Sequence, residues 1–158
     1  MYWLSKFNVT IFVDFDKSNI SYLKNIISRL RSGLIALVYP EGTRSRDGSM
    51  GEPKSGFVKI AHSMNVPIVP IAMKGTFDIL PPHKFFPKLK RCEIIVGEKI
   101  FVNKSNPEFT HCFDEKGNLS KEGVEEIALR IMNKIAKSID QPWGKSLYPK
   151  LRSFKIDG

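Results

Sequence analysis

The chain has 158 residues, which favours one domain that buries about 70% of the surface its unfolded form would expose. It carries 25 lysines and arginines against 16 acids, a net charge of +9, which predicts an anionic partner: a phosphorylated substrate, an anionic lipid surface, an acidic carrier protein or nucleic acid. The cysteines Cys92 and Cys112 lack metal-ligand spacing, and no apolar run approaches the ~18 residues that span a bilayer, so we expect a soluble or surface-bound protein without a metal.

The chain begins with an apolar and aromatic stretch, residues 1–8, which could tuck under the fold as a short anchoring helix. Val9 to Phe15 then has the composition of a strand. Ser18 is expected to cap a helix that Gly33 ends, because the apolar residues between them follow the 3.6-residue period. Those residues are Ile20, Leu23, Ile26, Ile27 and Leu30.

A second strand is predicted from Leu34 to Val38, ending at Pro40 because proline has no N–H to donate to a ladder. The turn that follows runs Glu41-Gly42-Thr43-Arg44. Gly42 allows backbone to approach a ligand closely, and Arg44 offers the planar, always-charged group that suits phosphate. An ordinary surface turn, in which Glu41 pairs with Arg44, is the alternative.

Lys54 and Gly56 lead into a helix predicted from Gly56 to Met64, whose first amide groups would face the same turn. In open α/β sheets, a polar turn after a buried strand is the usual ligand site. The sequence therefore predicts an anion site, most simply for a phosphate ester. His62, beside the apolar face of the helix, is interpreted as a hydrogen-bonded structural histidine.

The segment Val66–Ala72 is a strand interrupted by two prolines, which predicts an edge or irregular position. The loop Phe77–Arg91 mixes aromatic residues with lysines and could dip into a membrane interface, or could pack on its own sheet. Another strand is expected from Cys92 to Val96.

After a turn-rich stretch, Ser120 is predicted to cap a long helix reaching Ile139, with acids in its first turns and lysines in its last. Its apolar stripe is read as a core face. The basic and aromatic tail, residues 141–158, could touch membrane or RNA; disorder or local packing are the alternatives.

Five pieces of this sequence, in order, resemble the 1-acylglycerol-3-phosphate acyltransferases (lysophosphatidate acyltransferases) of the glycerolipid acyltransferase superfamily. The pieces are Ile11-Phe12-Val13-Asp14, the run from Tyr39 to Gly48, Lys54-Ser55-Gly56, the run from Val66 to Ala72, and Gly97-Glu98-Lys99-Ile100. The resemblance implies an α/β fold with a central, mostly parallel sheet flanked by helices. It assigns residues 1–140 to a partial acyltransferase domain and residues 141–158 to a tail.

The resemblance also implies the roles of particular residues. The substrate phosphate would be bound by Glu41, Gly42, Thr43, Arg44, Lys54 and Gly56, and the substrate cleft would be lined by Pro67, Ile68, Val69 and Pro70. Family members commonly carry Gly and Arg where this chain has Val9 and Phe15. Since the family's arginine contacts phosphate there, Phe15 would weaken substrate affinity.

The family's catalytic block, His-x4-Asp, is absent from these residues. Five positions after His62, His83 and His111 stand Pro67, Lys88 and Lys116. Acyl transfer from a thioester to an alcohol needs such a base, and losing one typically lowers the rate about 10²–10⁴-fold. In the family a segment like residues 1–8 follows the catalytic block, so the resemblance implies a chain that begins partway into the domain.

From the resemblance we expect a protein that transfers an acyl group from acyl-coenzyme A or acyl-carrier protein to 1-acyl-glycerol-3-phosphate, giving phosphatidate. It would act peripherally at the cytoplasmic membrane face, with no bound cofactor. The chain is either a truncated acyltransferase or a remnant that binds without turnover. The rivals are a catalytically silent lipid-phosphate-binding module and, less favoured because no recognised motif accompanies the charge, a nucleic-acid-binding domain.

Overall fold

The computed structural model describes residues 20–82 and 84–157, which divide after Leu37 into two units. The first contains helix α1, Ile20–Arg31. At its end Gly33 has a φ of 82°, and the Leu34 amide donates to the Arg29 carbonyl at 3.1 Å. The predicted helix and its glycine stop are therefore confirmed. Its proposed cap, Ser18, and the predicted strand Val9–Phe15 lie outside the described residues.

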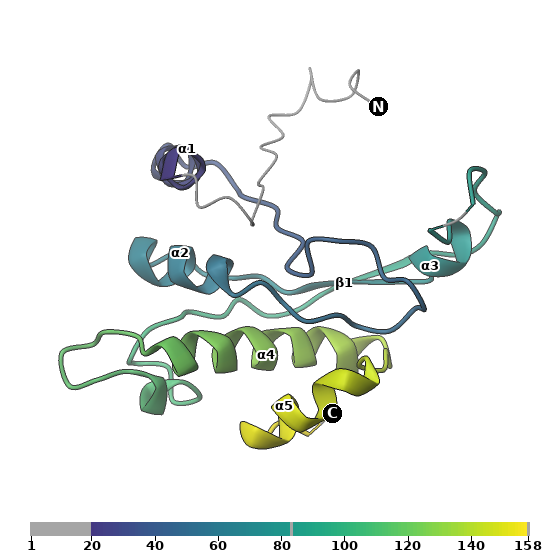
Figure 1. The fold of residues 1–158 in the computed structure, drawn as a ribbon. Helices are drawn as coiled ribbons and strands as arrows, with labels where there is room; N and C mark the ends of the chain where they lie inside the picture. Colours follow the sequence, from purple (N-terminus) through teal and green to yellow (C-terminus); the bar gives the residue numbers. More distant parts are fainter. Residues whose placement is uncertain (1–19, 83, 158) are drawn as a thin grey trace. The chain divides into compact units, whose positions relative to one another are not determined.

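The second unit begins at Val38 and holds the remaining elements (Figure 1). In chain order they are α2 (Gly56–Met64), β1 (Ile71–Lys74), α3 (Thr76–Ile79), β2 (Glu93–Val96), the 3-10 turn η2 (Thr110–Cys112), α4 (Lys121–Ser138), the 3-10 turn η3 (Lys145–Leu147) and α5 (Tyr148–Ser153). Helix α2 has the predicted bounds. Helix α4 begins as predicted, with the Ser120 hydroxyl accepting from the Gly123 amide at 2.9 Å.

The expected central parallel sheet is not confirmed. Within residues 20–82 and 84–157 the sheet is an antiparallel pair, β1 with β2, in which Ile71 faces Val96 and Lys74 faces Glu93. The prediction of a buried strand from Leu34 to Val38 is wrong: these residues are exposed, and they make no ladder with any part of the chain that the structure describes. A buried strand needs a neighbour on each side, and its expected neighbour lies in the undescribed N-terminal segment.

The predicted strand at Val66–Ala72 is irregular, as its prolines indicate. The ladder between β1 and β2 begins at Ile71. Upstream of it, a separate bridge joins Ile68 to Ile100 through reciprocal hydrogen bonds of 2.8 and 2.7 Å. Pro70, which lies between Ile68 and Ile71, has no N–H to donate, so the pairing is interrupted there. The other predicted strand begins one residue later than expected, at Glu93.

Helix α4 is the centre of the core, and its two ends pack on different elements. Toward its N-terminus, Ile127 packs in a cluster that includes Val58 of α2 and Phe109. Toward its C-terminus, Met132 packs with Trp143 and other residues of the tail, among them Leu147, Leu151 and Ile156. The predicted core face of this helix is confirmed, and of the alternatives left open for the tail, the structure shows local packing.

The two faces of the β1–β2 pair differ sharply. Ala72 is buried on the face toward α4. On the opposite face, β alternation places together four apolar side chains that are all exposed. They are Ile71, Met73, Ile94 and Val96.

Candidate functional site

The predicted anion site is a closed loop, residues 40–54, which we call the anion loop. At its base, the Lys54 amide donates to the Pro40 carbonyl at 2.8 Å. The Glu41 carboxylate accepts from the Gly51 amide at 2.6 Å. A Cβ at position 51 would lie 2.9 Å from that carboxylate, so a side chain there would displace it. Glu41 therefore organises the loop, and its contact is with backbone rather than with Arg44.

The middle of the anion loop is held by its own short polar side chains. The Ser45 hydroxyl donates to the Ser49 carbonyl at 2.8 Å and accepts from the Gly48 amide at 2.9 Å. Asp47 accepts from the Ser49 hydroxyl at 2.6 Å and from the Ser49 amide at 2.9 Å. These hydrogen bonds lower the pKa of Asp47. The shape of the loop is therefore held by its own hydrogen bonds.

The residues predicted to touch phosphate lie on or beside this loop. Gly42, with a φ of 66°, makes the turn that brings its amide to the Tyr39 carbonyl at 3.0 Å. Thr43 and Arg44 follow it and are exposed. The Arg44 guanidinium donates through Nη2 to the carbonyl of Leu80, a partner that sequence reasoning missed. One hydrogen bond leaves four of its five N–H donors for an anion.

Helix α2 starts at the base of the anion loop because Lys54 is joined to Pro40. Its N-cap residue, Ser55, makes no side-chain capping hydrogen bond. The first amides of the helix, beginning at Gly56, are thus not capped by that hydroxyl, and they carry the positive end of the helix dipole. Anion binding at this helix start stays a prediction.

Residues of the tail also bind the anion loop. The Met50 amide donates to the Pro142 carbonyl at 2.8 Å, and the Gly144 amide donates to the Met50 carbonyl at 2.9 Å. The Lys150 ammonium lies 2.5 Å from the Glu52 carboxylate of the loop and 3.2 Å from the Glu125 carboxylate of α4. The hydrogen bond from Lys150 to Glu52 raises the lysine's pKa. Sequence reasoning missed this support, because nothing local couples positions about 100 residues apart.

The predicted substrate cleft is only partly a cavity. Pro70 is buried and lines a cavity of about 360 Å³ together with Gly97, Ile100 and Lys134. Ile68 is held in the bridge to Ile100, while Pro67 and Val69 are exposed. No residue of the anion loop lines this cavity. Among the described residues, the structure therefore does not join the two predicted halves of the site in one pocket.

A second cavity, of about 480 Å³, lies beside the anion loop. Gly48 of the loop lines it together with Gly75, Phe77 and Arg91, which lie in the segment between β1 and β2. A Cβ at Gly48 would lie 3.5 Å from the Phe77 ring, so the loop and that segment are in close contact.

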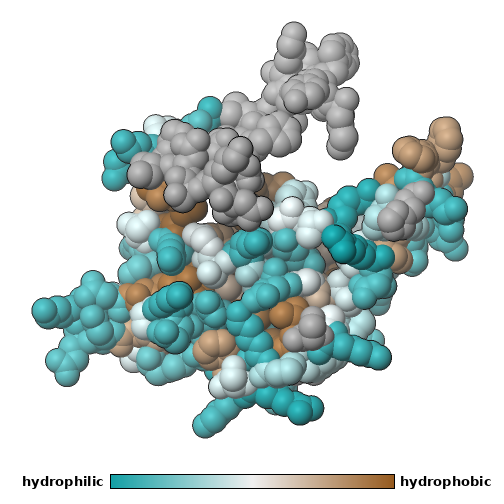
Figure 2. Space-filling model, in the orientation of Figure 1, coloured by the Kyte–Doolittle hydropathy of each residue, from teal (hydrophilic) through white to brown (hydrophobic). Residues whose placement is uncertain are grey.

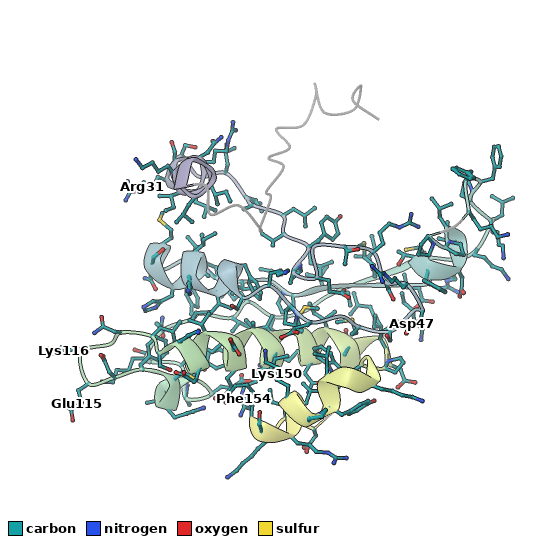
Figure 3. All side chains as sticks on the ribbon, in the orientation of Figure 1. Arg31, Asp47, Glu115, Lys116, Lys150 and Phe154 are labelled. Carbon is teal, nitrogen blue, oxygen red and sulfur yellow. The ribbon has the colours of Figure 1, made fainter. Side chains whose placement is uncertain are left out.

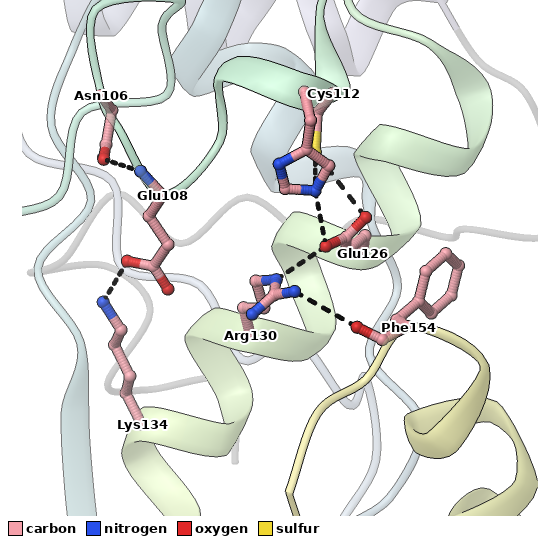
Figure 4. Close-up of polar contacts among 8 residues, drawn as sticks. Asn106, Glu108, Cys112, Glu126, Arg130, Lys134 and Phe154 are labelled. Carbon is pink, nitrogen blue, oxygen red and sulfur yellow. Dashed lines mark hydrogen bonds and ion pairs between the residues drawn. The ribbon is translucent and has the colours of Figure 1, made fainter.

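Away from the anion loop, three potential metal ligands lie within 4.8 Å of one another: His111, Cys112 and Glu126 (Figure 4). His111 Nε2 lies 2.9 Å from the Glu126 carboxylate and 3.6 Å from the Cys112 sulfur. Arg130 donates to the same carboxylate at 2.7 Å. A cation placed here would meet the charge of Arg130, which already compensates Glu126, so the cluster is best explained as a structural network.

The ionisation of this network also argues against nucleophilic chemistry. Burial and the neighbouring Glu126 raise the pKa of the Cys112 thiol to about 11, so the thiolate is scarce at neutral pH. Burial tends to raise the pKa of Glu126, but hydrogen bonds from His111 and Arg130 outweigh it and lower that pKa. Sequence reasoning considered His111 and Cys112 but missed Glu126, which stands 14 positions beyond Cys112 on another element.

The other described histidine is also accounted for structurally. His62 Nδ1 lies 2.9 Å from the Val102 carbonyl, and its ring is tilted against Phe113 with centroids 5.2 Å apart. This matches the prediction of a structural histidine. His83 lies outside the described residues.

Comparison with known proteins bears on the N-terminal half. Residues 1–74 match the protein family described as Acyltransferase. This segment is therefore similar to acyltransferases. The match includes the whole anion loop and α2, which confirms the resemblance drawn from their residues.

Similar proteins agree with this family. A chloroplast 1-acyl-sn-glycerol-3-phosphate acyltransferase of Brassica napus is 40% identical over 65 residues, which are 41% of this chain and 19% of the relative. A probable 1-acyl-sn-glycerol-3-phosphate acyltransferase of Mycoplasma pneumoniae is 37% identical over 78 residues, 49% of this chain and 29% of the relative. The matched segments thus span less than a third of either relative.

A solved structure extends the likeness to the fold. The 1-acyl-sn-glycerophosphate acyltransferase of Thermotoga maritima matches with a TM-score of 0.56 and 25% identity, over 78% of this chain and 46% of that one. The fold of this chain is therefore similar to part of an acyltransferase. No helix in the described residues has the length and apolar character to cross a bilayer.

Proposed function

We propose that this chain is the phosphate-binding part of an acyltransferase that acylates 1-acyl-glycerol-3-phosphate to phosphatidate. The observation that carries the proposal is that the anion loop, with its exposed Arg44, falls inside the segment that matches the family. The relatives named above are 1-acyl-sn-glycerol-3-phosphate acyltransferases. The acyl donor would be acyl-coenzyme A or an acyl-carrier protein thioester.

Each predicted residue has a role consistent with its place. Arg44 would bind the phosphate with its planar fork, and Lys54 would add charge at the start of α2. Gly42 and Gly56 would let backbone amides approach the phosphate oxygens. Glu41 would act indirectly, by holding the loop through Gly51. Thr43 would contribute its exposed hydroxyl, and the segment Pro67–Pro70 would line the path of the acyl chain.

The reaction requires a base that this chain does not supply in the family's manner. The acceptor hydroxyl must lose its proton as its oxygen attacks the thioester carbonyl, forming the new C–O bond while the C–S bond breaks. The proton then passes from the base to the departing thiolate. We propose that the base comes from a His-x4-Asp block outside these 158 residues.

The exposed face of the β1–β2 pair supports this view of a partial domain. Four apolar side chains on one sheet face are expected to be covered in a stable protein. We propose that the rest of the acyltransferase domain covers them. The intact enzyme would act peripherally at the cytoplasmic face of a membrane, where its lipid substrate and product reside.

Two measurements test this function. Titration calorimetry with sn-glycerol 3-phosphate should show binding that glycerol does not give, because the phosphate supplies the recognised charge. Release of free thiol from acyl-coenzyme A, dependent on lysophosphatidate, should be absent with this chain. It should appear when the chain is produced with a preceding His-x4-Asp segment from its own reading frame. Phosphate binding without turnover in either form would instead support the catalytically silent lipid-phosphate-binding module. Absence of phosphate binding would overturn both.

A further inference from the structure

The segment between β1 and β2 forms a projecting arm, residues 75–92, whose outer part, residues 84–90, we call the arm tip (Figure 1). Its base is tightly closed. A Cβ at Gly75 would lie 2.4 Å from the Arg91 carbonyl oxygen, so the two sides of the arm almost touch there. Further out, the Lys88 amide donates to the Ile79 carbonyl at 2.8 Å. Contacts between its two sides therefore hold the arm in a defined conformation.

The arm tip exposes large apolar side chains. Phe85 is 95% exposed, Phe86 86% and Leu89 105%. Figure 2 shows an apolar end on the projecting arm. The alternative that this loop packs on its own sheet is wrong for these three residues. Apolar groups gathered at a tip in this way mark an interaction surface.

Cations alternate with these apolar residues. Lys84, Lys88 and Lys90 are exposed within the arm tip, and the sequence from Leu80 to Cys92 contains no acid. Arg91, at the base, lies 3.3 Å from Glu93. Apolar side chains that enter the acyl boundary, with lysines at the level of anionic head groups, are the pattern of an interfacial membrane anchor. A nucleic acid would use the charge but would leave the aliphatic Leu89 without a partner.

The arm is joined directly to the anion loop. Arg44 donates to the carbonyl of Leu80, where the arm turns outward. Phe77, in α3, packs against Gly48 of the loop. The arm that would bind a lipid surface is therefore connected, through Leu80 and Phe77, to the residues predicted to bind phosphate.

We propose that the arm tip inserts Phe85, Phe86 and Leu89 into the interface of an anionic membrane, with its three lysines on the head groups. The inference deepens the proposed function and rests on it for its purpose, since it presents the anion loop to a lipid substrate. The two contributions to membrane binding can be measured separately. The apolar contribution persists at high salt, whereas the contribution of the lysines weakens as salt screens the charges.

The test is co-sedimentation of the full chain with vesicles of phosphatidylcholine and phosphatidylglycerol in equal parts, over a series of salt concentrations. The apolar variant is Phe85→Ser with Phe86→Ser, and the charge variant is Lys84→Gln, Lys88→Gln and Lys90→Gln. A matched control changes three exposed lysines elsewhere: Lys116→Gln, Lys121→Gln and Lys137→Gln. Lys116 lies at the opposite end of this unit from the arm (Figure 3).

We expect the apolar variant to bind vesicles about 100-fold more weakly, at about tenfold for each phenylalanine, with the loss persisting at high salt. The charge variant should lose about 100-fold at low salt and little at high salt, and the control only a few-fold. All variants should keep the parent's circular dichroism and its affinity for sn-glycerol 3-phosphate. That affinity separates failure of the arm from failure of the proposed function.

Equal losses from the charge variant and the control would show only a diffuse attraction of a basic protein, and the inference would be overturned. It would also be overturned if the apolar variant bound vesicles like the parent. Tighter binding to RNA or to an acidic carrier protein than to vesicles, abolished by the same lysine changes, would assign the arm tip to a different partner.

Discussion

Replacing Gly75 by alanine should open the base of the arm, whereas the same change at Gly117 should not. Both glycines have similar positive φ angles, 88° and 83°. An alanine at either position would carry the strain of a left-handed backbone, about 1 kcal/mol. The two positions differ in the room available to a side chain. A Cβ at Gly75 would lie 2.4 Å from the Arg91 carbonyl oxygen, while one at Gly117 would have no neighbour within 4 Å.

The close contact sets the size of the difference. A backbone oxygen cannot swing aside as a flexible side chain can, so the two sides of the arm must separate. Overpacking of this kind costs about 1–3 kcal/mol. Gly75→Ala should therefore lower the free energy of unfolding by about 2–4 kcal/mol, or open the arm locally, while Gly117→Ala lowers it by about 1 kcal/mol.

Urea unfolding and amide hydrogen exchange together distinguish global from local opening. The Lys88 amide, which donates to Ile79 across the arm, should exchange at least about tenfold faster in Gly75→Ala, corresponding to about 1.4 kcal/mol. In Gly117→Ala it should exchange as in the parent. Equal unfolding energies and equal Lys88 exchange in the two variants would refute the close approach of Gly75 to Arg91.

Three further outcomes follow from the core and from the network around α4. Glu126→Gln should lower the free energy of unfolding at neutral pH by about 1.5–3 kcal/mol, because hydrogen bonds from His111 and from the charged Arg130 lower the folded pKa of this carboxyl. That advantage of the parent is present above the ordinary value of 4.5 and is lost as pH falls through the folded pKa, so urea midpoints of parent and variant should converge in acid. A gap that stays constant would contradict the charge argument. Iodoacetamide should modify exposed Cys92 much faster than buried Cys112, whose pKa is about 11, as peptide mapping would show; equal rates would contradict its burial. Trp143→Ala should lower the free energy of unfolding in urea by about 3–5 kcal/mol, because Trp143 is buried. It should also weaken binding of sn-glycerol 3-phosphate, because the adjacent residues Pro142 and Gly144 hydrogen-bond to Met50 of the anion loop. Unchanged binding would show that these hydrogen bonds are dispensable.

Helices could be predicted well here because their signals are local. The apolar period and the Ser120 cap located α4, and Gly33 located the end of α1. Strands were harder, since a strand exists only with a partner. Leu34–Val38 has the composition of a buried strand but makes no ladder in the described part of the chain.

The same contrast between local signals and distant partners applies to the candidate site. The anion loop could be predicted from residue types within a few positions, such as Gly42 and Arg44. Its supports could not, because Arg44 to Leu80 spans 36 positions and Lys150 to Glu52 spans 98. Such contacts depend on how elements pack in space, which no periodicity or spacing encodes. Residue patterns therefore predict a phosphate ester as the ligand of the anion loop, and the structure shows which contacts hold the loop in place.

The most direct test of the central claim, that the anion loop recognises a phosphate ester, is calorimetric titration of sn-glycerol 3-phosphate at fixed salt into the parent, Arg44→Ala, Arg44→Lys and Arg46→Ala. Charge-assisted hydrogen bonds contribute about 1.5–3 kcal/mol, so Arg44→Ala should weaken binding by about 10–150-fold. Arg44→Lys should recover only part, since an ammonium cannot make the bidentate contact. Arg46, exposed on the same loop, should matter several-fold less. Equal losses from Arg44→Ala and Arg46→Ala would show that the loop acts as diffuse positive charge and would contradict the assignment of the site.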